Sequence, residues 1–348
     1  MAVYIGVDFH ARQQTISYLT SEEGEIRQLQ LDHGQPAAVR KFYEQFAGQR
    51  VIVGFEASGY AAWFEELLEE LGCEIWIGHA TAIRTYARRR QKNDRRDADL
   101  ILDLLVRGDF PRIHRHSAAS RVVLQQLRYR QRLVKLRTMI VNQLVFMAAS
   151  RGVSFRTQLK SERGVRRLKE LSLPAPLSEQ RDELCHLLLE LKAKIATVEQ
   201  WLAAQAERDQ RVQRLRTHHG IGPLTGLCLV STLEPVERFA NARKLTAYIG
   251  FDPVEDSSGD RQRIGSISKQ GSRLLRFYLV EAGQVAIRKD ADLARAYKRL
   301  LLRRGHAKAK VAIARRLLIR AFIMLRDEID YAEFLRRGVA ARSSRATA

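Results

Sequence analysis

The sequence predicts an α/β domain followed by a larger, mainly helical region, and three observations carry this prediction. Short apolar runs alternate with amphipathic stretches over the first 110 residues, as in a sheet with helices on its faces. Beyond residue 110, apolar residues recur mostly at helical spacing. The charge changes at the same place: residues 1–110 carry 13 Lys and Arg against 17 Asp and Glu, whereas residues 111–348 carry 47 against 22.

Five strands and three helices are expected in the first domain. Residues 3–9 and 51–56 are apolar runs that each contain a single acid, as in central strands. Two runs with polar alternation flank a turn at 21–24, which is typical of a hairpin. A three-strand meander followed by βαβ-like alternation implies a mixed sheet with helices on its faces. The other expected strands are 13–19, 25–31 and 73–77, and the expected helices are 37–46, 61–71 and 98–106.

Two long helical runs are expected in the middle of the chain. Apolar residues step by three and four from Leu133 to Met147, and again from Leu184 to Leu202, where they make nearly three heptads. Ser178, shortly after two prolines, is the expected N-cap of the second run. The pattern favours equally two helices that pack on each other within one chain and a coiled coil that joins two subunits.

The last third of the chain is expected to begin near Arg216 with the turn Gly220-Ile221-Gly222, which leads into a helix. His218 and His219 lie in this turn without the spacing of zinc ligands. Further helices are expected at 241–249, from the N-cap Ser272 to about residue 288, and at 307–325, with a Gly/Ser-rich loop at 251–271. The predicted domains are therefore 1–110, 111–210 and 211–336, followed by a flexible tail at 337–348.

Composition excludes several classes of protein. Apolar residues make up 45% of the chain and charged residues 28%, as in a folded protein. The first ten residues do not resemble a signal peptide, and no run of eighteen uncharged apolar residues is present. Three cysteines without a CxxC spacing fit a reducing cytoplasm. The net charge of +21 indicates a nucleic-acid partner, the alternative being a basic surface that serves solubility.

Four acids in the first domain are candidates for a metal site. Asp8 lies inside an apolar strand, where an unpaired carboxylate is costly, and Glu56 closes a second apolar strand. Asp94 and Asp97 lie three residues apart at the entry to a helix. Mg²⁺ and Mn²⁺ prefer such oxygen ligands, and two ions about 3.5–4 Å apart would stabilise the attacking and leaving oxygens of phosphoryl transfer. The alternative for the two aspartates is a solvated cluster with the arginines between them.

Basic residues crowd the segment before these aspartates, as a nuclease needs in order to draw phosphate toward carboxylates; an incidental solvated loop is the alternative. Residues 111–160 contain eleven Lys and Arg and no carboxylate. Near residue 220, N–H groups at a helix N-terminus would contact phosphate as in helix-hairpin-helix proteins, although a plain capping turn fits equally well. The residues expected to contact nucleic acid are Arg88, Arg89, Arg90, Lys92, Arg128, Arg130, Arg132, Lys135, Gly220, Gly222 and Lys269.

Six short motifs follow one another along the chain: Gly6-Val7-Asp8, Glu56-Ala57-Ser58-Gly59, Asp94-Arg95-Arg96-Asp97-Ala98, Gly220-Ile221-Gly222-Pro223, Ser257-Ser258-Gly259 and Ile267-Ser268-Lys269-Gln270-Gly271. Taken together, they resemble the motifs of the transposases of the IS110 family of bacterial insertion sequences, including its IS1111 branch. With residues 307–318, the resemblance covers nearly the whole chain in the expected order, which makes it specific. It extends to a Ser-Ser-Gly loop that would otherwise be assigned to a linker.

The resemblance implies a fold and a mechanism. The first domain would be RNase H-like, related to Holliday-junction resolvases, with the four acids (DEDD) as Mg²⁺ ligands. The C-terminal transposase domain would supply a serine nucleophile that forms a phosphoserine link to DNA; Ser258 is favoured and Ser257 is the near alternative. Members also use a noncoding bridge RNA to pair with element ends and target DNA. They would act as homodimers or homotetramers through the coiled coil, in the bacterial cytoplasm at the nucleoid.

Three other functions fit part of the pattern. A junction-resolving nuclease would use the same four acids without a serine ester. An actin-like ATPase also carries Gly-x-Asp on its first strand, but it needs Gly-rich phosphate loops that the later strands lack, and it leaves the positive charge unexplained. A nucleic-acid-binding protein with a decayed site would not be expected to keep all four acids.

Overall fold

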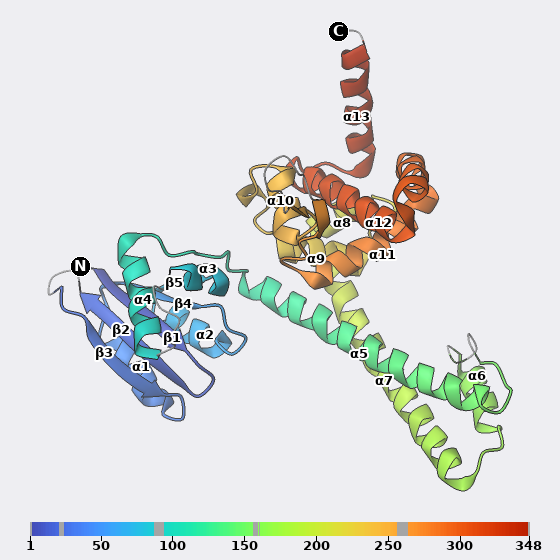
Figure 1. The fold of residues 1–348 in the computed structure, drawn as a ribbon, viewed down its shortest axis with the longest axis horizontal. Coiled ribbons are helices and arrows are strands. Elements are labelled where there is room, and N and C mark those ends of the chain that lie inside the picture. The colour runs from blue at the N-terminus through green and yellow to red at the C-terminus, as the bar shows by residue number, and fades with distance from the viewer. Residues whose placement is uncertain are drawn as a thin grey trace. The chain divides into compact units, whose positions relative to one another are not determined.

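A computed structural model describes residues 2–20, 24–86, 94–155, 159, 161–255 and 264–346 (Figure 1). The chain forms two compact units, Met1–Arg115 and His116–Ala348. The first unit extends beyond the expected boundary at residue 110 because the following residues are fastened to it. The N–H of Ile113 donates to the carbonyl of Ile77 at 2.8 Å, and the Arg115 guanidinium pairs with Glu65 at 2.8 Å.

The first unit is built on a five-stranded sheet in the order β3-β2-β1-β4-β5. β1 is antiparallel to β2 and parallel to β4, so the expected mixed sheet is confirmed. β2 and β3 are antiparallel, and β4 and β5 are parallel. The strands are β1 (Ala2–Phe9), β2 (Gln13–Thr20), β3 (Arg27–Asp32), β4 (Arg50–Glu56) and β5 (Glu74–Gly78).

Helices cover both faces of this sheet. Alternate residues of β1, beginning with Val3, pack in one core with α1 (Pro36–Glu44) and α2 (Ala62–Glu70). The opposite face is covered by α4 (Asp94–Arg107), whose buried leucines pack with Ile52 and with Ile83 of α3 (Ala80–Thr85). Because side chains alternate along a strand, the even-numbered residues of β1 and β4 face α4.

Two glycines let α4 approach the sheet closely. A Cβ on Gly6 would lie 2.5 Å from the backbone nitrogen of Leu102, and a Cβ on Gly54 would lie 2.7 Å from the side chain of Leu105. Gly6 and Gly54 are register partners in the parallel pair β1 and β4. A hydrogen bond also holds α4 on β2, because Oδ1 of Asp99 accepts from Oγ of Ser17 at 2.6 Å.

The second unit begins with two long helices, α5 (Ala118–Ala149) and α7 (Ala175–Arg208), which lie side by side in opposite directions (Figure 1). The short helix α6 (Glu162–Lys169) lies between them in the chain. The apolar seam of α7 is buried at Leu188, Ile195 and Leu202. Leu188 belongs to one hydrophobic core and Leu202 to another, and both cores also contain side chains from α5. The seam is therefore covered within the chain.

The start of α7 differs from expectation. Pro174 is the N-cap and the helix begins at Ala175, so Ser178 lies inside the first turn, where its Oγ donates to the carbonyl of Ala175 at 2.9 Å. The expected N-cap at Ser178 is wrong because proline, which lacks an N–H, is accommodated in the first turn of a helix.

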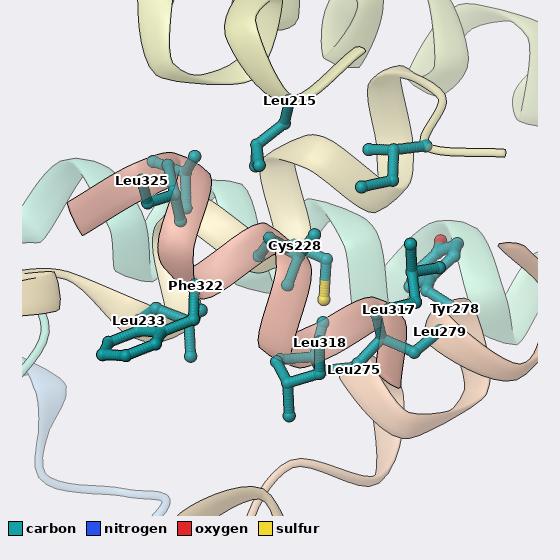
Figure 2. Packing of buried hydrophobic residues seen from close by; sticks show 14 of the residues in the cluster. Leu215, Cys228, Leu233, Leu275, Tyr278, Leu279, Leu317, Leu318, Phe322 and Leu325 are labelled. Carbon is teal, nitrogen blue, oxygen red and sulfur yellow. The ribbon is translucent and has the colours of Figure 1, made fainter. Parts of the chain in front are cut away.

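The rest of the second unit packs around α9 (Pro223–Leu233). This helix is buried from Thr225 to Leu233, and Figure 2 shows Cys228 among side chains of α11 (Arg273–Lys289) and α12 (Ala291–Arg326), such as Leu275 and Phe322. The same core includes Leu124 of α5, so the expected division near residue 210 falls inside this unit. The elements are α8 (Gln210–Arg216), α9 (Pro223–Leu233), a 3₁₀ turn (Val236–Arg238), α10 (Ala242–Ile249), β6 (Pro253–Glu255), β7 (Ile264–Ile267), α11 (Arg273–Lys289), α12 (Ala291–Arg326) and α13 (Tyr331–Ala346).

Several expectations for this region need refinement. The expected loop at 251–271 contains the antiparallel pair β6 and β7, whose strands are too short to produce a clear alternation. The helix expected at 307–325 is the second part of α12, which Gly305 interrupts with φ 77° and ψ 168°. α13 continues to Ala346 through the tail that was expected to fray, and Glu333 pairs with Arg336 and Arg337 one turn later. Ser272 caps α11, as predicted, by accepting from the N–H of Leu275 at 3.2 Å.

A buried polar network ties the turn after α8 to α12 and α13. The Arg320 guanidinium donates to Asp290 at 2.5 Å and to the Tyr331 hydroxyl at 3.0 Å. The His218 ring lies 4.1 Å from the Tyr331 ring, and its Nδ1 donates to the carbonyl of His219 at 2.7 Å. Burial lowers the pKa of His218 to about 4. His218 is thus a packed turn residue that is held neutral.

Gly6→Ala is expected to destabilise the first unit, because the new methyl would meet backbone atoms of α4 that cannot turn aside. Overpacking of this kind costs about 1–3 kcal/mol. The measurement is urea unfolding of the full chain, followed by circular dichroism. Gly59→Ala is the matched control, since nothing lies within 4 Å of its added Cβ. Equal losses in the two variants would contradict the close approach of α4.

The second unit is expected to lose stability as the pH falls toward 4. A histidine in the unfolded chain takes up its proton near pH 6.5, whereas folded His218 does so only at about 4. Between these values the unfolded state binds one more proton, so the free energy of unfolding falls by about 1.4 kcal/mol per pH unit. Urea unfolding across this range should show a shallower slope in His218→Gln than in the wild type. His219→Gln, at an exposed neighbour, should keep the full slope; identical slopes in all three proteins would refute the assignment.

Candidate functional site

Three polar side chains meet where β1 ends and α4 begins. Single ligand atoms of Asp8, His10 and Asp94 all lie within 4.8 Å of one another. The Nε2 atom of His10 is 3.1 Å from Oδ2 of Asp8 and 3.8 Å from Oδ1 of Asp94. Two of the four predicted acids are thus neighbours, and they share a histidine that the sequence analysis did not name. Its signal was available: a residue two positions after Asp8 projects to the same side of an extended chain.

The other two predicted acids, Asp97 and Glu56, lie near the same end of the sheet. Asp97, in the first turn of α4, is close enough to Asp8 for the two carboxylates to repel. Glu56 ends β4, the parallel neighbour of β1, on the face that α4 covers. Its carboxylate lies 3.5 Å from the Arg84 guanidinium, and it is not part of the compact group of ligand atoms found among the described residues.

The electrostatics of this group favour a bound cation. Burial raises the pKa of Asp8 above its ordinary value, the hydrogen bond from His10 opposes that shift, and the carboxylates of Asp94 and Asp97 add to it. The side chains of Asp8 and Asp94 are 17% and 45% exposed, so the group opens to solvent on the α4 side. Carboxylates suit Mg²⁺ and Mn²⁺, and the imidazole nitrogen suits Mn²⁺ better than Mg²⁺. The residues present therefore fit a divalent metal ion.

Several predicted site residues lie outside the described part of the chain. These are both candidate nucleophiles and the first four predicted nucleic-acid contacts: Ser257, Ser258, Arg88, Arg89, Arg90 and Lys92. Lys269 is described; it is exposed and has φ 59° in the segment between β7 and α11.

The predicted basic residues of α5 have different environments. Arg130 is engaged within the protein, because its Nε donates to Glu199 of α7 at 2.8 Å and so ties the two long helices together. Arg128, Arg132 and Lys135 are exposed and line a pocket of the second unit. Three of the four predicted residues of α5 therefore remain open to a partner.

The two predicted glycines serve the packing of the turn between α8 and α9. Gly220 has φ 92°, and a Cβ there would lie 2.4 Å from the carbonyl oxygen of Ala282 on α11. Gly222 is the N-cap of α9, and Pro223 after it has no N–H to offer. Contact of this turn with phosphate stays a prediction.

Comparison with known families shows what the two parts of the chain are similar to. Residues 5–147 match the family model of the DEDD transposases of the IS110 type, described as "Transposase". Residues 212–299 match the family described as "Transposase IS116/IS110/IS902 family". The chain therefore carries two regions that match transposase domains of the IS110/IS116/IS902 family, and the match to the DEDD model implies an RNase H-like fold for the first unit.

Similar proteins support this assignment along most of the chain. A "Probable family 20 transposase" of Pseudomonas aeruginosa is 29% identical over 321 residues, which cover 89% of this chain and 93% of the relative. The transposase for insertion sequence element IS1111A of Coxiella burnetii is 28% identical over 277 residues, 75% of this chain and 74% of the relative. The transposase for insertion sequence element IS1328 of Yersinia enterocolitica is 25% identical over 241 residues, 67% of this chain and 70% of the relative.

Such homologues imply an enzyme that cleaves and transfers DNA strands. Among the helices that the structure describes, none combines the length and the apolar character needed to span a bilayer.

Mn²⁺ is expected to bind the full chain through the acid group, and Asp8→Asn should weaken binding at least about tenfold because it removes the most buried charged ligand. Isothermal titration with Mn²⁺, and with Mg²⁺ in parallel, measures the change. Asp109→Asn, at an exposed aspartate outside the group, is the control. His10→Ala tests the histidine: a loss for Mn²⁺ that exceeds the loss for Mg²⁺ is expected if His10 is a ligand. Unchanged binding in Asp8→Asn would exclude this group as the metal site.

Proposed function

We propose that this protein cleaves and exchanges DNA strands of an insertion sequence through a metal-dependent DEDD site and a covalent phosphoserine intermediate. The observation that carries the proposal is the meeting of Asp8 and Asp94 at one end of the sheet, in a chain whose two transposase domains follow in order. The metal ligands would be Asp8, Glu56, Asp94 and Asp97, with His10 beside them.

The first unit would act on the scissile phosphate. A bound divalent ion supplies positive charge that stabilises the oxygens of the phosphoryl group as charge develops on them. The carboxylates of Asp8 and Asp94 would hold this ion, and the exposed side of the group, at Asp94, would admit the phosphate. Glu56 lies on the neighbouring strand, where release from Arg84 would allow it to join the other acids.

The serine would conserve the energy of the phosphodiester bond. Its Oγ attacks phosphorus, the bond to the leaving sugar oxygen breaks, and that oxygen takes up a proton. The hydroxyl of another strand then attacks the phosphoserine, which restores the serine hydroxyl and joins the strands. Ser258 is the favoured nucleophile and Ser257 the alternative; both follow β6 in the sequence. No histidine adjoins these serines in sequence, so we infer that the metal site activates the hydroxyl.

The partners we propose are the DNA of element ends and target, and a noncoding bridge RNA as guide. The surplus of positive charge in residues 111–348 supports a unit that holds two kinds of nucleic acid. Because α5 covers the seam of α7 within the chain, a homodimer or homotetramer would use the outer surface of this helix pair. The exposed Met139 and Phe146 of α5 lie on that outer surface.

The deciding experiment is a denaturing gel of end-labelled donor and target DNA, incubated with Mg²⁺ and protein purified with whatever RNA it carries. A labelled band that shifts on protease treatment should appear with the wild type and disappear in Ser258→Ala. Ser257→Ala run beside it distinguishes the two serines and serves as the matched control. Asp8→Ala should abolish the same band if the metal site activates the serine.

Other patterns on this gel would contradict parts of the proposal. Free nicked strands in the wild type and in both serine variants would mean a junction-type nuclease that hydrolyses DNA with the same acids. A covalent band that persists at full yield in Asp8→Ala would leave the serine chemistry standing but refute its activation by metal.

A further inference from the structure

The second unit contains a pocket of about 610 Å³ between α5, the end of α9, α10 and the start of α11. Its size falls within the range of about 300–1,000 Å³ that is typical of sites for small molecules and cofactors. All the residues that line it belong to this one unit. The acid group lies in the other unit and shares no residue with this pocket.

Four cations line this pocket, and no carboxylate does. Arg128, Arg132 and Lys135 lie on one face of α5 at steps of four and three, and Arg273 is the first residue of α11. In the described part of the chain none of these four side chains pairs with an acid, in contrast to Arg130, which lies between Arg128 and Arg132 in the sequence. The first turn of α11 borders the same space, and the N-terminus of a helix favours an anion. The pocket is therefore built for a phosphate.

Two aromatic side chains and an amide also line the pocket. Phe277 lines it with 42% of the residue exposed, and Tyr248 lines it with one ring face under the Arg238 guanidinium at 4.4 Å. The side-chain oxygen of Gln131, also in the lining, is buried and accepts no hydrogen bond from any described residue. An aromatic ring at the rim stacks on a base, and an amide oxygen accepts from a base edge.

We propose that this pocket takes one unpaired nucleotide of a bound strand, an inference that rests on the proposed function only in requiring a nucleic-acid substrate. Its phosphate lies among Arg128, Arg132 and Arg273, its base stacks on Phe277, and Gln131 accepts a hydrogen bond from the base edge. A free phosphate would leave Phe277 and Gln131 unused, and a duplex could not present its base to either. Strands of DNA and of RNA share this chemistry, and the experiment separates them.

The test uses the full chain without divalent metal, so that no strand is cleaved. The probes are a fluorescein-labelled stem with one bulged adenosine and the same stem with an abasic bulge, each made as DNA and as RNA. Fluorescence anisotropy gives the four affinities. The base should strengthen wild-type binding at least about fivefold, in the range of one base stacked on an aromatic ring. The arm in which this difference appears, DNA or RNA, identifies the source of the nucleotide.

Two variants test the contact with the base and the contact with the phosphate separately. Phe277→Ala should remove the advantage of the base and leave the affinity for the abasic stem unchanged. Arg132→Gln should weaken both stems equally, because both keep the phosphate. The matched controls are Tyr129→Ala, an aromatic residue of α5 that is likewise 42% exposed but does not line the pocket, and Lys194→Gln on α7.

The outcomes distinguish this inference from the proposed function. Wild-type binding that does not distinguish the bulged base from the abasic site would overturn the pocket and leave the transposase proposal intact. Equal losses in Phe277→Ala and Tyr129→Ala would also overturn it, since the effect would then not depend on the pocket. Absence of binding to any of the four probes would contradict both.

Discussion

The close packing of α4 on β1 and β4 is the constraint on which the candidate metal site depends. Gly6 and Gly54 lie opposite each other in register, and each is small enough to let the helix lie against the strands. The next even-numbered residues of the two strands are Asp8 and Glu56, which therefore face the same helix. The hydrogen bond from Ser17 to Asp99 fixes the position of α4 along its own axis. The first turn of α4, which carries Asp94, therefore lies beside Asp8. Strand alternation and one helix contact thus place acids that are far apart in the sequence.

In the second unit, internal pairing decides which charges remain available. Glu199 is occupied by Arg130 between the long helices, and Asp290 by Arg320 and Tyr331 beneath the turn after α8. Breaking the buried Arg320–Asp290 pair is costly because the partner charge stays behind, so Asp290 serves the fold. The basic residues of α5 that line the pocket have no such partner among the described residues, and they carry their positive charge to the surface.

The sequence predicted the sheet because strands depend on local patterns, and the same patterns singled out the acids, whose role as metal ligands stays a prediction. Apolar runs of six or seven residues located β1 and β4, and their terminal acids marked one edge of the sheet. Features that depend on contacts far apart in the chain were not predictable in the same way: nothing near Arg130 indicates that Glu199 lies opposite it. The cap at Pro174 was missed because serine and proline compete for the same few positions at a helix start. The spacing of two residues between Asp8 and His10 was the available signal for His10, and it was missed because a single histidine beyond a strand does not by itself form a motif.

Positive charge and the shape of a pocket have different effects on a bound nucleic-acid strand. A surface as basic as that of the second unit binds any phosphate backbone, and such contacts fix neither the sequence nor the register of what is bound. The mechanism proposed above needs the scissile phosphate at one position relative to the acids and the serine, because a displacement of about 1 Å is enough to slow such chemistry greatly. A pocket that accepts a single unpaired base would fix the position of the strand along the protein, which basic side chains alone do not do. The aromatic and amide groups of the pocket therefore matter for register, whereas its cations matter for affinity.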